Sequence, residues 1–477
     1  ICAAAKKTKK KRYLDAFKYE VAEPLMSGKF TFTSKVNMLK SSHNNNAKEK
    51  NVKYGLAVIG SGPAGHTAAF EAAKRGIKTC LIEKDMEHIG GVCLNEGCIP
   101  LKGYLHYSEH EKDFLAIKGK VAQKIKLLRE GLKSRLKAAG IELIEAEAAF
   151  EDEEALIAGK NRIKAEKILI ACGSAQKRLF PNSPSVHSSD KVFEMGRVPG
   201  KVLIIGGGVV GCEYASFFSN IGVAVDVVEA ADTILAGFDP EAVRVLGREF
   251  KKKKIALFEK SVVKSVGNQS VIIGMPSGEI EKDYDMIFEA TGRVPAAARL
   301  KTAKAGITLS SKGFIETDKN MMTSNPRVYA AGDCVDSPML AYTASLEAET
   351  AVSHIAGEKT AAIDYSSVPM ITFSSPQIGS CGSAAGAEMK EYKYFFKAVG
   401  KAVVESNDAG FIKILADKKT GVISHITAAG GNIAELMNEA ALIIKNKMTV
   451  KKVISSVHIH PSYGEIITEA LKNGEKI

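Results

Sequence analysis

Two cysteines, Cys93 and Cys98, stand five residues apart in a stretch that opens with a pair of glycines and closes with Pro100. A close cysteine pair in a cytosolic protein favours redox chemistry or metal binding over a structural bridge. In a regular helix the Cα atoms of such a pair lie roughly 8–9 Å apart, too far for a disulfide, so bridging them requires a deformed backbone. We expect a bridge held in that way to be readily reduced, and thiolate character near a helix N-terminus suits thiol exchange.

A zinc site and a pair of unreactive core cysteines are the two alternatives to a redox pair. A zinc site needs about four ligands, and no second pair follows Cys93 and Cys98 at a spacing typical of zinc sites. The two residues could also be unpaired core cysteines, because most of the eight cysteines stand in apolar surroundings, where free thiols behave as small hydrophobic groups. We expect a redox pair and no metal site.

A second set of residues able to do acid-base chemistry stands near the end of the chain, where His458, His460 and Glu465 follow one another closely. Attack by a dithiol needs a thiolate, and an imidazole tuned by a carboxylate can take up protons near neutral pH. Taken alone, a histidine five residues before a glutamate is more often structural. Together with the cysteine pair, it becomes a candidate base, and His458 is expected to pack or to form a hydrogen bond.

Glycine-rich turns provide the elements that would hold nucleotides beside these groups. After the apolar run 56–59 come Gly60, Gly62 and Gly65, then a helical stretch, a second apolar run at 79–82, and Glu83. Glycines at this spacing let the backbone approach a pyrophosphate at a helix N-terminus, and the acidic residue suits the ribose hydroxyls. The pattern predicts a strand, a turn, a helix and a second strand that together bind a dinucleotide.

The same arrangement recurs with Gly206, Gly208 and Gly211 after the apolar run 202–205, and with Glu229 after the run 224–228. In both copies the acidic residue stands 23 positions after the first glycine. Glycine turns also arise only to pack strands against helices, but two copies with matching acidic ends favour two nucleotide sites.

Glu229 also indicates which nucleotide the second unit takes. A carboxylate there repels a 2′-phosphate and accepts hydrogen bonds from a free ribose hydroxyl pair. The next three residues, 230–232, supply no arginine for a phosphate. The sequence therefore favours NAD over NADP.

The cysteine stretch, with Leu94 and Asn95 between the cysteines, resembles the redox-active motif of the class I pyridine nucleotide-disulfide oxidoreductases, in the form found in dihydrolipoamide dehydrogenases. The likeness covers essentially all of the chain from Tyr54 onward. It continues in three further segments, Ala171–Ser174, Ala290–Arg293 and Tyr329–Asp333, and in the C-terminal segment His458–Glu465.

This resemblance implies roles for the reactive residues. Cys93 would exchange with a substrate thiol, and Cys98 would lie against the flavin of FAD and pass electrons toward NAD in the second unit. His460 would be the base and Glu465 the carboxylate that orients it. Lys102 and Glu213 match the family's pair near the flavin and the nicotinamide, although the two residues could instead form a surface ion pair of little energetic value.

The match also implies residues that contact each cofactor. For FAD these are Gly60, Gly62, Gly65, Glu83, Lys84, Gly91, Val92, Lys102, Ala148, Gly173, Asp333 and Ala341. For NAD they are Gly206, Gly208, Val209, Gly211, Glu213, Glu229, Val263 and Gly292. Among these, Asp333 resembles the family aspartate that binds the ribityl chain.

The expected fold is α/β, with two Rossmann-like nucleotide-binding domains and a C-terminal α+β dimerisation domain. The expected segments are a disordered basic extension (1–53), the first part of the FAD domain (54–175), the NAD domain (176–294), the second part of the FAD domain (295–360) and the interface domain (361–477). The resemblance further implies a homodimer in which the histidine of one subunit completes the site of the other.

Some positions depart from the family pattern. Leu101 stands where a small hydroxyl residue is usual, Ala296 where asparagine is usual, and Tyr342 where some members carry histidine. The segment after Tyr107 is also shorter than usual. We expect these departures to affect rate and flavin potential more than the type of reaction.

Charge and hydropathy exclude some other classes of function. Residues 1–53 hold thirteen Lys and Arg against four Asp and Glu, so +9 of the net charge of +12 lies there. We interpret this segment as a solvated tail and expect no nucleic-acid partner. No apolar run approaches the roughly 18–20 residues that cross a bilayer, and no secretory leader opens the chain, so a cytoplasmic location without a membrane partner is expected.

The resemblance implies an NAD-dependent dehydrogenase that oxidises protein-bound dihydrolipoamide to lipoamide. Its partners would be the lipoyl domains of a 2-oxoacid dehydrogenase or glycine-cleavage complex. An NADPH-dependent disulfide or mercuric reductase of the same family is one alternative, and Glu229 argues against it. A noncatalytic scaffold subunit is the alternative from another class, and retention of the cysteines and of the His460–Glu465 pair argues against it.

Overall fold

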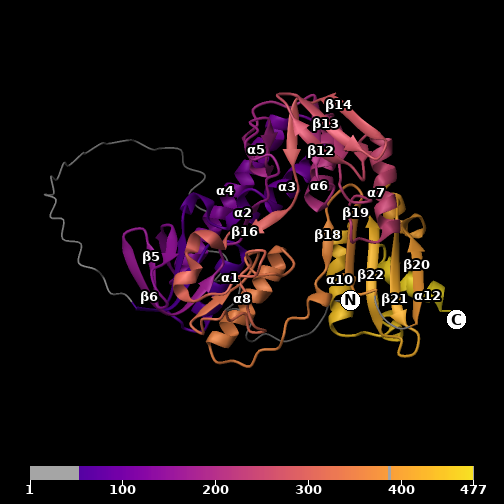
Figure 1. The fold of residues 1–477 in the computed structure, drawn as a ribbon. Helices are drawn as coiled ribbons and strands as arrows, with labels where there is room; N and C mark the ends of the chain where they lie inside the picture. Colours follow the sequence, from indigo (N-terminus) through magenta and orange to yellow (C-terminus); the bar gives the residue numbers. More distant parts are fainter. Residues whose placement is uncertain (1–52, 385–387, 476–477) are drawn as a thin grey trace, which may run out of the picture. The chain divides into compact units, whose positions relative to one another are not determined.

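The computed structural model describes residues 53–384 and 388–475, and their strands form five sheets (Figure 1). Apart from Lys53, the basic extension expected at residues 1–53 lies outside the described residues. None of the helices in the described part of the chain combines the length and the apolar character needed to cross a membrane.

The first sheet has the order β3-β2-β1-β6-β5-β4, and β17 also pairs with β6. The pairs among β1, β2, β3, β6 and β17 are parallel, whereas β4 and β5 add antiparallel pairs. The strands are β1 (Lys53–Ile59), β2 (Thr79–Glu83), β3 (Glu142–Glu145), β4 (Ala148–Phe150), β5 (Ala155–Ala158), β6 (Asn161–Ile170) and β17 (Val328–Ala330). Because β17 comes from a distant segment, the chain returns to this sheet after forming the second one.

The second sheet is entirely parallel, with the order β11-β10-β9-β15-β8. Its strands are β8 (Val186–His187), β9 (Lys201–Ile205), β10 (Ala224–Val228), β11 (Ala256–Phe258) and β15 (Met286–Glu289). Two smaller antiparallel sheets accompany it: β12 (Val262–Val266), β13 (Ser270–Met275) and β14 (Gly278–Asp283) form one, and β7 (Ser174–Gln176) and β16 (Arg293–Pro295) form the other.

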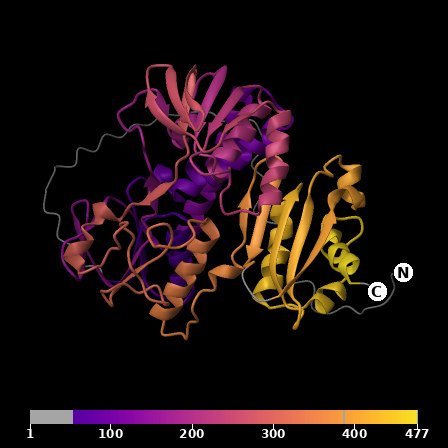
Figure 2. The same ribbon diagram turned by 45° about the vertical axis from the view of Figure 1, so that its right-hand side comes forward.

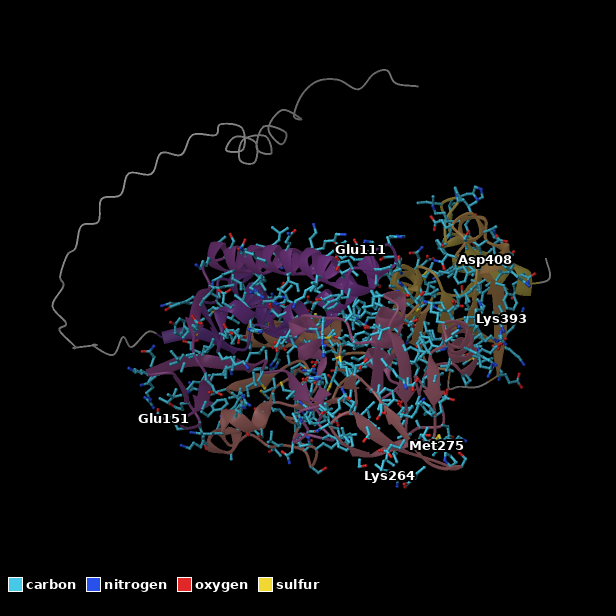
Figure 3. The ribbon with its side chains drawn as sticks, turned by 90° about the horizontal axis from the view of Figure 1, so that it is seen from above. Glu111, Glu151, Lys264, Met275, Lys393 and Asp408 are labelled. Carbon is cyan, nitrogen blue, oxygen red and sulfur yellow. The ribbon has the colours of Figure 1, made fainter. Side chains whose placement is uncertain are left out.

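The C-terminal sheet is antiparallel, and Figure 2 shows its strands side by side in orange and yellow. Its order is β18-β19-β22-β21-β20, with the strands β18 (Met370–Thr372), β19 (Gln377–Gly382), β20 (Met389–Phe395), β21 (Phe411–Asp417) and β22 (Ile423–Gly430). Lys393 on β20, labelled in Figure 3, contacts Glu241 with its Nζ atom 2.5 Å from Oε1. This ion pair joins the C-terminal sheet to the helix that follows β10.

The described α-helices are α1 (Pro63–Lys74), α2 (Gly91–Asn95), α3 (Cys98–Ser108), α4 (Phe114–Ala138), α5 (Ser189–Glu194), α6 (Val209–Asn220), α7 (Pro240–Lys252), α8 (Ala341–Ile355), α9 (Gly400–Val404), α10 (Ile433–Lys445), α11 (Val450–Ile454) and α12 (Glu465–Gly474). Short 3₁₀ helices occupy Met86–His88, Ala297–Leu300, Thr302–Ala305, Tyr365–Ser367 and Phe396–Ala398. α1 and α8 pack together in the hydrophobic core of the first sheet, which combines buried residues from 54–171 and 297–352.

The α/β fold expected from the sequence is confirmed, as are the four strands that flank the two glycine motifs. Each motif folds as expected, since α1 starts directly after Gly62 and α6 directly after Gly208. The expected domain boundaries at 175, 294 and 360 stay a prediction.

The glycines of the second motif differ in what a side chain would meet, which gives a test of the fold. A Cβ on Gly211 would lie 1.9 Å from the carbonyl oxygen of Gly206, whereas a Cβ on Gly208 would have no atom within 4 Å. Because the carbonyl that it would strike belongs to the backbone of the turn, we expect Gly211→Ala to lower the free energy of unfolding by about 2 kcal/mol or more. Denaturant unfolding of both variants checks this, with Gly208→Ala as the control that stays close to the parent protein. Equal stability of the two variants would contradict this packing.

Candidate active site

The two cysteines meet because the chain breaks between two short helices. α2 ends at Asn95, the backbone turns through Glu96 and Gly97, and α3 starts at Cys98. Gly97 has φ −130° and ψ −110°, and a Cβ there would crowd the carbonyl oxygen of Val92 at 3.1 Å. The deformation expected from the sequence is present, and a hydrogen bond joins the side chains of Cys93 and Cys98.

The hydrogen bond makes the two thiols unequal. The bond that Cys93 donates, together with the positive charge of Lys102, lowers the pKa of Cys98 to about 7. The pKa of Cys93 is raised by the same bond and by burial. Cys98 is therefore the thiol that ionises near neutral pH, while Cys93 keeps its proton.

Lys102, one turn into α3, extends the site toward α6. Its Nζ atom lies 2.8 Å from Oε2 of Glu213 and 4.7 Å from the centre of the Phe373 ring. The side chain of Glu213 is 1% exposed and that of Lys102 is 31% exposed. The backbone N–H of Phe373 donates to the other carboxylate oxygen of Glu213 at 2.9 Å. A buried carboxylate with two donors differs from the surface ion pair considered as the alternative.

The first glycine turn lies directly against the cysteine stretch. Gly60 has φ +95°, and no atom lies within 4 Å of a Cβ built on Gly62. A Cβ on Gly91 would lie 2.8 Å from Cα of Gly62, so the segment before Cys93 abuts the turn. The carboxylate of Glu83 accepts hydrogen bonds from the backbone N–H and the hydroxyl of Ser61, at 3.0 and 2.6 Å.

The second turn repeats this geometry. Gly206 has φ +108°, and Gly208 is open in the same way as its counterpart in the first turn. Glu229 accepts hydrogen bonds from the backbone N–H groups of Gly207 and Ala231, at 2.6 and 2.7 Å. Its carboxylate is thereby fixed at the end of β10, beside the glycine turn.

A third set of polar side chains lies where β6 and β17 end side by side. Asp333, three residues after β17, accepts a hydrogen bond from the hydroxyl of Ser174 at 2.6 Å. Arg293 lies 3.8 Å from the same carboxylate oxygen and donates to the Ser174 hydroxyl. Gly173 has φ +68° beside them, so the expected FAD contacts Gly173 and Asp333 lie close together.

His460 and Glu465 also form the expected pair. Nδ1 of His460 lies 2.8 Å from Oε1 of Glu465, and the backbone N–H of Ser462 donates to Oε2. The hydrogen bond to His460 lowers the pKa of Glu465. The His460 side chain is 80% exposed, so its imidazole is open to a substrate or to a second subunit. His458 bonds to Glu439 at 2.8 Å, consistent with the structural part expected for it.

Comparison with known proteins shows one family match that spans both nucleotide-binding turns and the dithiol. Residues 54–348 match the family described as pyridine nucleotide-disulphide oxidoreductase, and residues 368–471 match the dimerisation domain of that family. The chain belongs to the pyridine nucleotide-disulphide oxidoreductase family. It is therefore an enzyme of the flavoprotein disulfide oxidoreductase type, and the cofactors of this family are FAD and NAD(H).

Several relatives of this oxidoreductase cover nearly its whole described length. Dihydrolipoyl dehydrogenase from Chlamydia muridarum is 32% identical, over 88% of this chain and 96% of its own. The enzyme of the same name from Geobacillus stearothermophilus is 31% identical, over 87% of this chain and 94% of its own. Among solved structures, the Cu(II) complex of the HOCl-induced flavoprotein disulfide reductase RclA from Escherichia coli has a TM-score of 0.83 and 25% identity, over 88% of this chain and 99% of its own.

The residues of this oxidoreductase fit the family's cofactors. The two open glycines, Gly62 and Gly208, leave space beside the N-termini of α1 and α6, where backbone N–H groups favour a pyrophosphate. The acidic residues Glu83 and Glu229 stand at the ends of the neighbouring strands.

The remaining predicted contacts stay predictions, and the structure shows only where they lie. Lys84 follows β2, and Val92 is in α2. The others are Ala148 in β4, Val209 at the start of α6, Val263 in β12, Gly292 between β15 and β16, and Ala341 at the start of α8. Of the departures from the family pattern, Leu101 is buried in a core cluster, and the hydroxyl of Tyr342 donates to the carbonyl oxygen of Pro369.

The imidazole of His88 forms a hydrogen-bonded bridge beside the cysteines that was not predicted from the sequence. Nδ1 of His88 lies 2.8 Å from Oδ2 of Asp85, and Nε2 of His88 lies 2.9 Å from Oε1 of Glu96. Glu96 stands between the two cysteines in the sequence. The side chain of Asn95 also donates to the carbonyl oxygens of His88 and Gly91. The sequence did contain a signal for this bridge, because Glu96 lies between the two cysteines and His88 stands eight residues before it.

The unequal thiols give a testable prediction. Removing the donor with Cys93→Ala is expected to raise the pKa of Cys98 by about 1–2 pH units, because a hydrogen bond to a charged group contributes about 1.5–3 kcal/mol. The rate at which iodoacetamide alkylates Cys98, followed by peptide mass spectrometry across pH, reports this value. Cys93→Ser keeps a hydroxyl donor and serves as the matched control. An unchanged pH profile in Cys93→Ala would show that Lys102 alone tunes the thiol.

Proposed function

We propose that this oxidoreductase is a dihydrolipoamide dehydrogenase, which oxidises protein-bound dihydrolipoamide to lipoamide and reduces NAD to NADH. The preference for NAD over NADP rests on the position of Glu229, whose carboxylate is fixed at the second glycine turn by two backbone N–H groups. A fixed negative charge there disfavours the 2′-phosphate that NADPH-dependent reductases must bind. The curated relatives named dihydrolipoyl dehydrogenase support the same substrate.

The unequal cysteines suit the proposed exchange. With His460 taking its proton, a substrate thiol attacks the sulfur of Cys93 in the Cys93–Cys98 disulfide, and Cys98 leaves as a thiolate. The thiol with the lower pKa is the better leaving group, and Cys98 has a pKa of about 7. The second substrate thiol then attacks the mixed disulfide, which releases lipoamide and leaves Cys93 protonated, in keeping with its raised pKa.

FAD, when bound, supplies the acceptor for the electron pair of the dithiol, and NAD supplies the final acceptor. Lys102 is placed to support the thiolate, because its ammonium lowers the pKa of Cys98 and is itself held by the buried Glu213. Glu465 holds Nδ1 of His460, which leaves Nε2 to take the substrate proton.

We further propose a homodimer that acts on the lipoyl domains of a 2-oxoacid dehydrogenase or glycine-cleavage complex in the cytoplasm. The match of residues 368–471 to the family's dimerisation domain supports the dimer. Apolar residues beside the exposed His460 also support it, since Val457 is 98% exposed and Ile459 is 79% exposed. Exposed apolar side chains next to a reactive group favour coverage by a second subunit.

Turnover with each nucleotide and each acceptor tests the proposed substrate. We expect rapid NADH formation from NAD and dihydrolipoamide, and weak activity with NADPH and either glutathione disulfide or mercuric ion, because Glu229 repels a 2′-phosphate. A strong preference for NADPH would overturn the assignment. A colourless purified protein that binds no FAD would instead support the scaffold alternative.

Mixed dimers test whether the base comes from the other subunit. Cys93→Ser and His460→Gln dimers are each expected to lose activity by about 10²-fold or more. After subunit exchange in equal amounts, about half of the dimers are mixed, and each has one intact site only if His460 acts across the interface, so about a quarter of the parent activity should return. A mixture that stays inactive, although mass spectrometry shows mixed dimers, would place His460 and Cys93 of one subunit in the same site.

A further inference from the structure

A second pair of cysteines lies where the first sheet ends, and the proposed reaction does not use it. Cys172 is two residues past the end of β6, and Cys334 is four residues past the end of β17. The two strands pair in parallel, and the backbone N–H of Ala331 donates to the carbonyl oxygen of Ile170 at 3.0 Å. This pairing brings together two cysteines that are far apart in the sequence.

The two thiols contact each other directly. Cys334 is fully buried, and its sulfur lies 3.7 Å from the carbonyl oxygen of Ile170 and 3.4 Å from that of Ala331. Cys172 packs against the same core but is only partly buried. A hydrogen bond joins the two thiols, in the same way that one joins Cys93 to Cys98.

The contact assigns different chemistry to each thiol. The hydrogen bond with Cys172, together with complete burial, raises the pKa of Cys334. The fully buried Cys334 therefore keeps its proton, and the partly exposed Cys172 is the member of the pair that an oxidant can reach first. Cys212 is a useful comparison. It is also buried, and its sulfur lies 3.3 Å from the backbone carbonyl oxygen of Gly207, but its pKa is raised mainly by desolvation rather than by a hydrogen bond with a second thiol.

We propose that Cys172 and Cys334 form a second dithiol–disulfide centre, which a hydroperoxide oxidises. The thiol of Cys172 attacks one oxygen of hydrogen peroxide, giving a sulfenic acid and one water. The thiol of Cys334 then attacks that sulfur, forming the disulfide and releasing a second water. Two thiols thus supply two electrons and two protons, and one peroxide becomes two waters.

Disulfide formation would act on the residues that flank the pair. Gly173 and Ser174 follow Cys172, Asp333 precedes Cys334, and the hydroxyl of Ser174 already bonds to Asp333 at 2.6 Å. A covalent link would fix the segment after β6 to the turn after β17, and so hold the carboxylate of Asp333 in one position. The oxidation state of this second centre would then change the positions of Gly173 and Asp333, two of the residues expected to contact FAD.

Peptide mapping of the flavin-loaded protein tests the proposal without depending on the proposed substrate. The protein is treated with hydrogen peroxide, its free thiols are blocked with N-ethylmaleimide, and it is digested without reductant. The Cys93→Ser/Cys98→Ser variant is treated in parallel to remove the first pair. In both proteins we expect a peptide that links Cys172 to Cys334 and disappears with dithiothreitol, while Cys212 stays a free thiol.

The variant Cys334→Ser gives the matched control, because its hydroxyl can still donate to the backbone carbonyls. We expect this variant to lose the linked peptide and to accumulate a sulfenic acid on Cys172, which dimedone traps. The proposal is overturned if both thiols remain free after peroxide treatment of the unsubstituted protein. It is equally overturned if Cys172 links to another cysteine, or if Cys334→Ser gives no dimedone adduct.

Discussion

The contact between the thiols of Cys93 and Cys98 is the interaction on which the site depends, and a break in the helix makes it possible. A continuous helix would hold the two residues too far apart to react with each other. The side chain of Asn95 maintains the break by donating to carbonyl oxygens of the preceding loop, while Arg129 of α4 donates to its oxygen at 3.0 Å. The spacing of the cysteines is thus held by neutral and charge-assisted hydrogen bonds.

Two close approaches connect this dithiol with the nucleotide turns. Gly91 abuts Gly62 so tightly that Gly91 has no space for a side chain, which places the cysteine stretch beside the first turn. Lys102, in turn, reaches the buried Glu213 in α6, the helix that begins at the second turn. Helix α3 therefore carries both Cys98 and Lys102. It holds one thiol of the pair and one end of the ion pair between the two nucleotide-binding units.

The parts of the fold that sequence could predict are those determined locally. Glycine spacing and the apolar runs correctly predicted the strands and helix starts around Gly60–Gly65 and Gly206–Gly211, since each feature needs only neighbouring residues. The His460–Glu465 pair also formed as expected. The contact of Cys172 with Cys334 could not be predicted, because it requires β17 to pair with β6 from a distant part of the chain. The bridge from His88 to Glu96 likewise depends on how the loop after β2 folds back on α2.

Reversible joining and separation of Cys93 and Cys98 next to bound flavin is the central expectation for this enzyme. Anaerobic titration of the FAD-loaded protein with dihydrolipoamide tests it most directly, with absorbance and thiol alkylation followed together. We predict a long-wavelength band from a thiolate beside the flavin, and alkylation of these two cysteines only after reduction. Absence of the band, with both side chains alkylated equally before and after reduction, would contradict it.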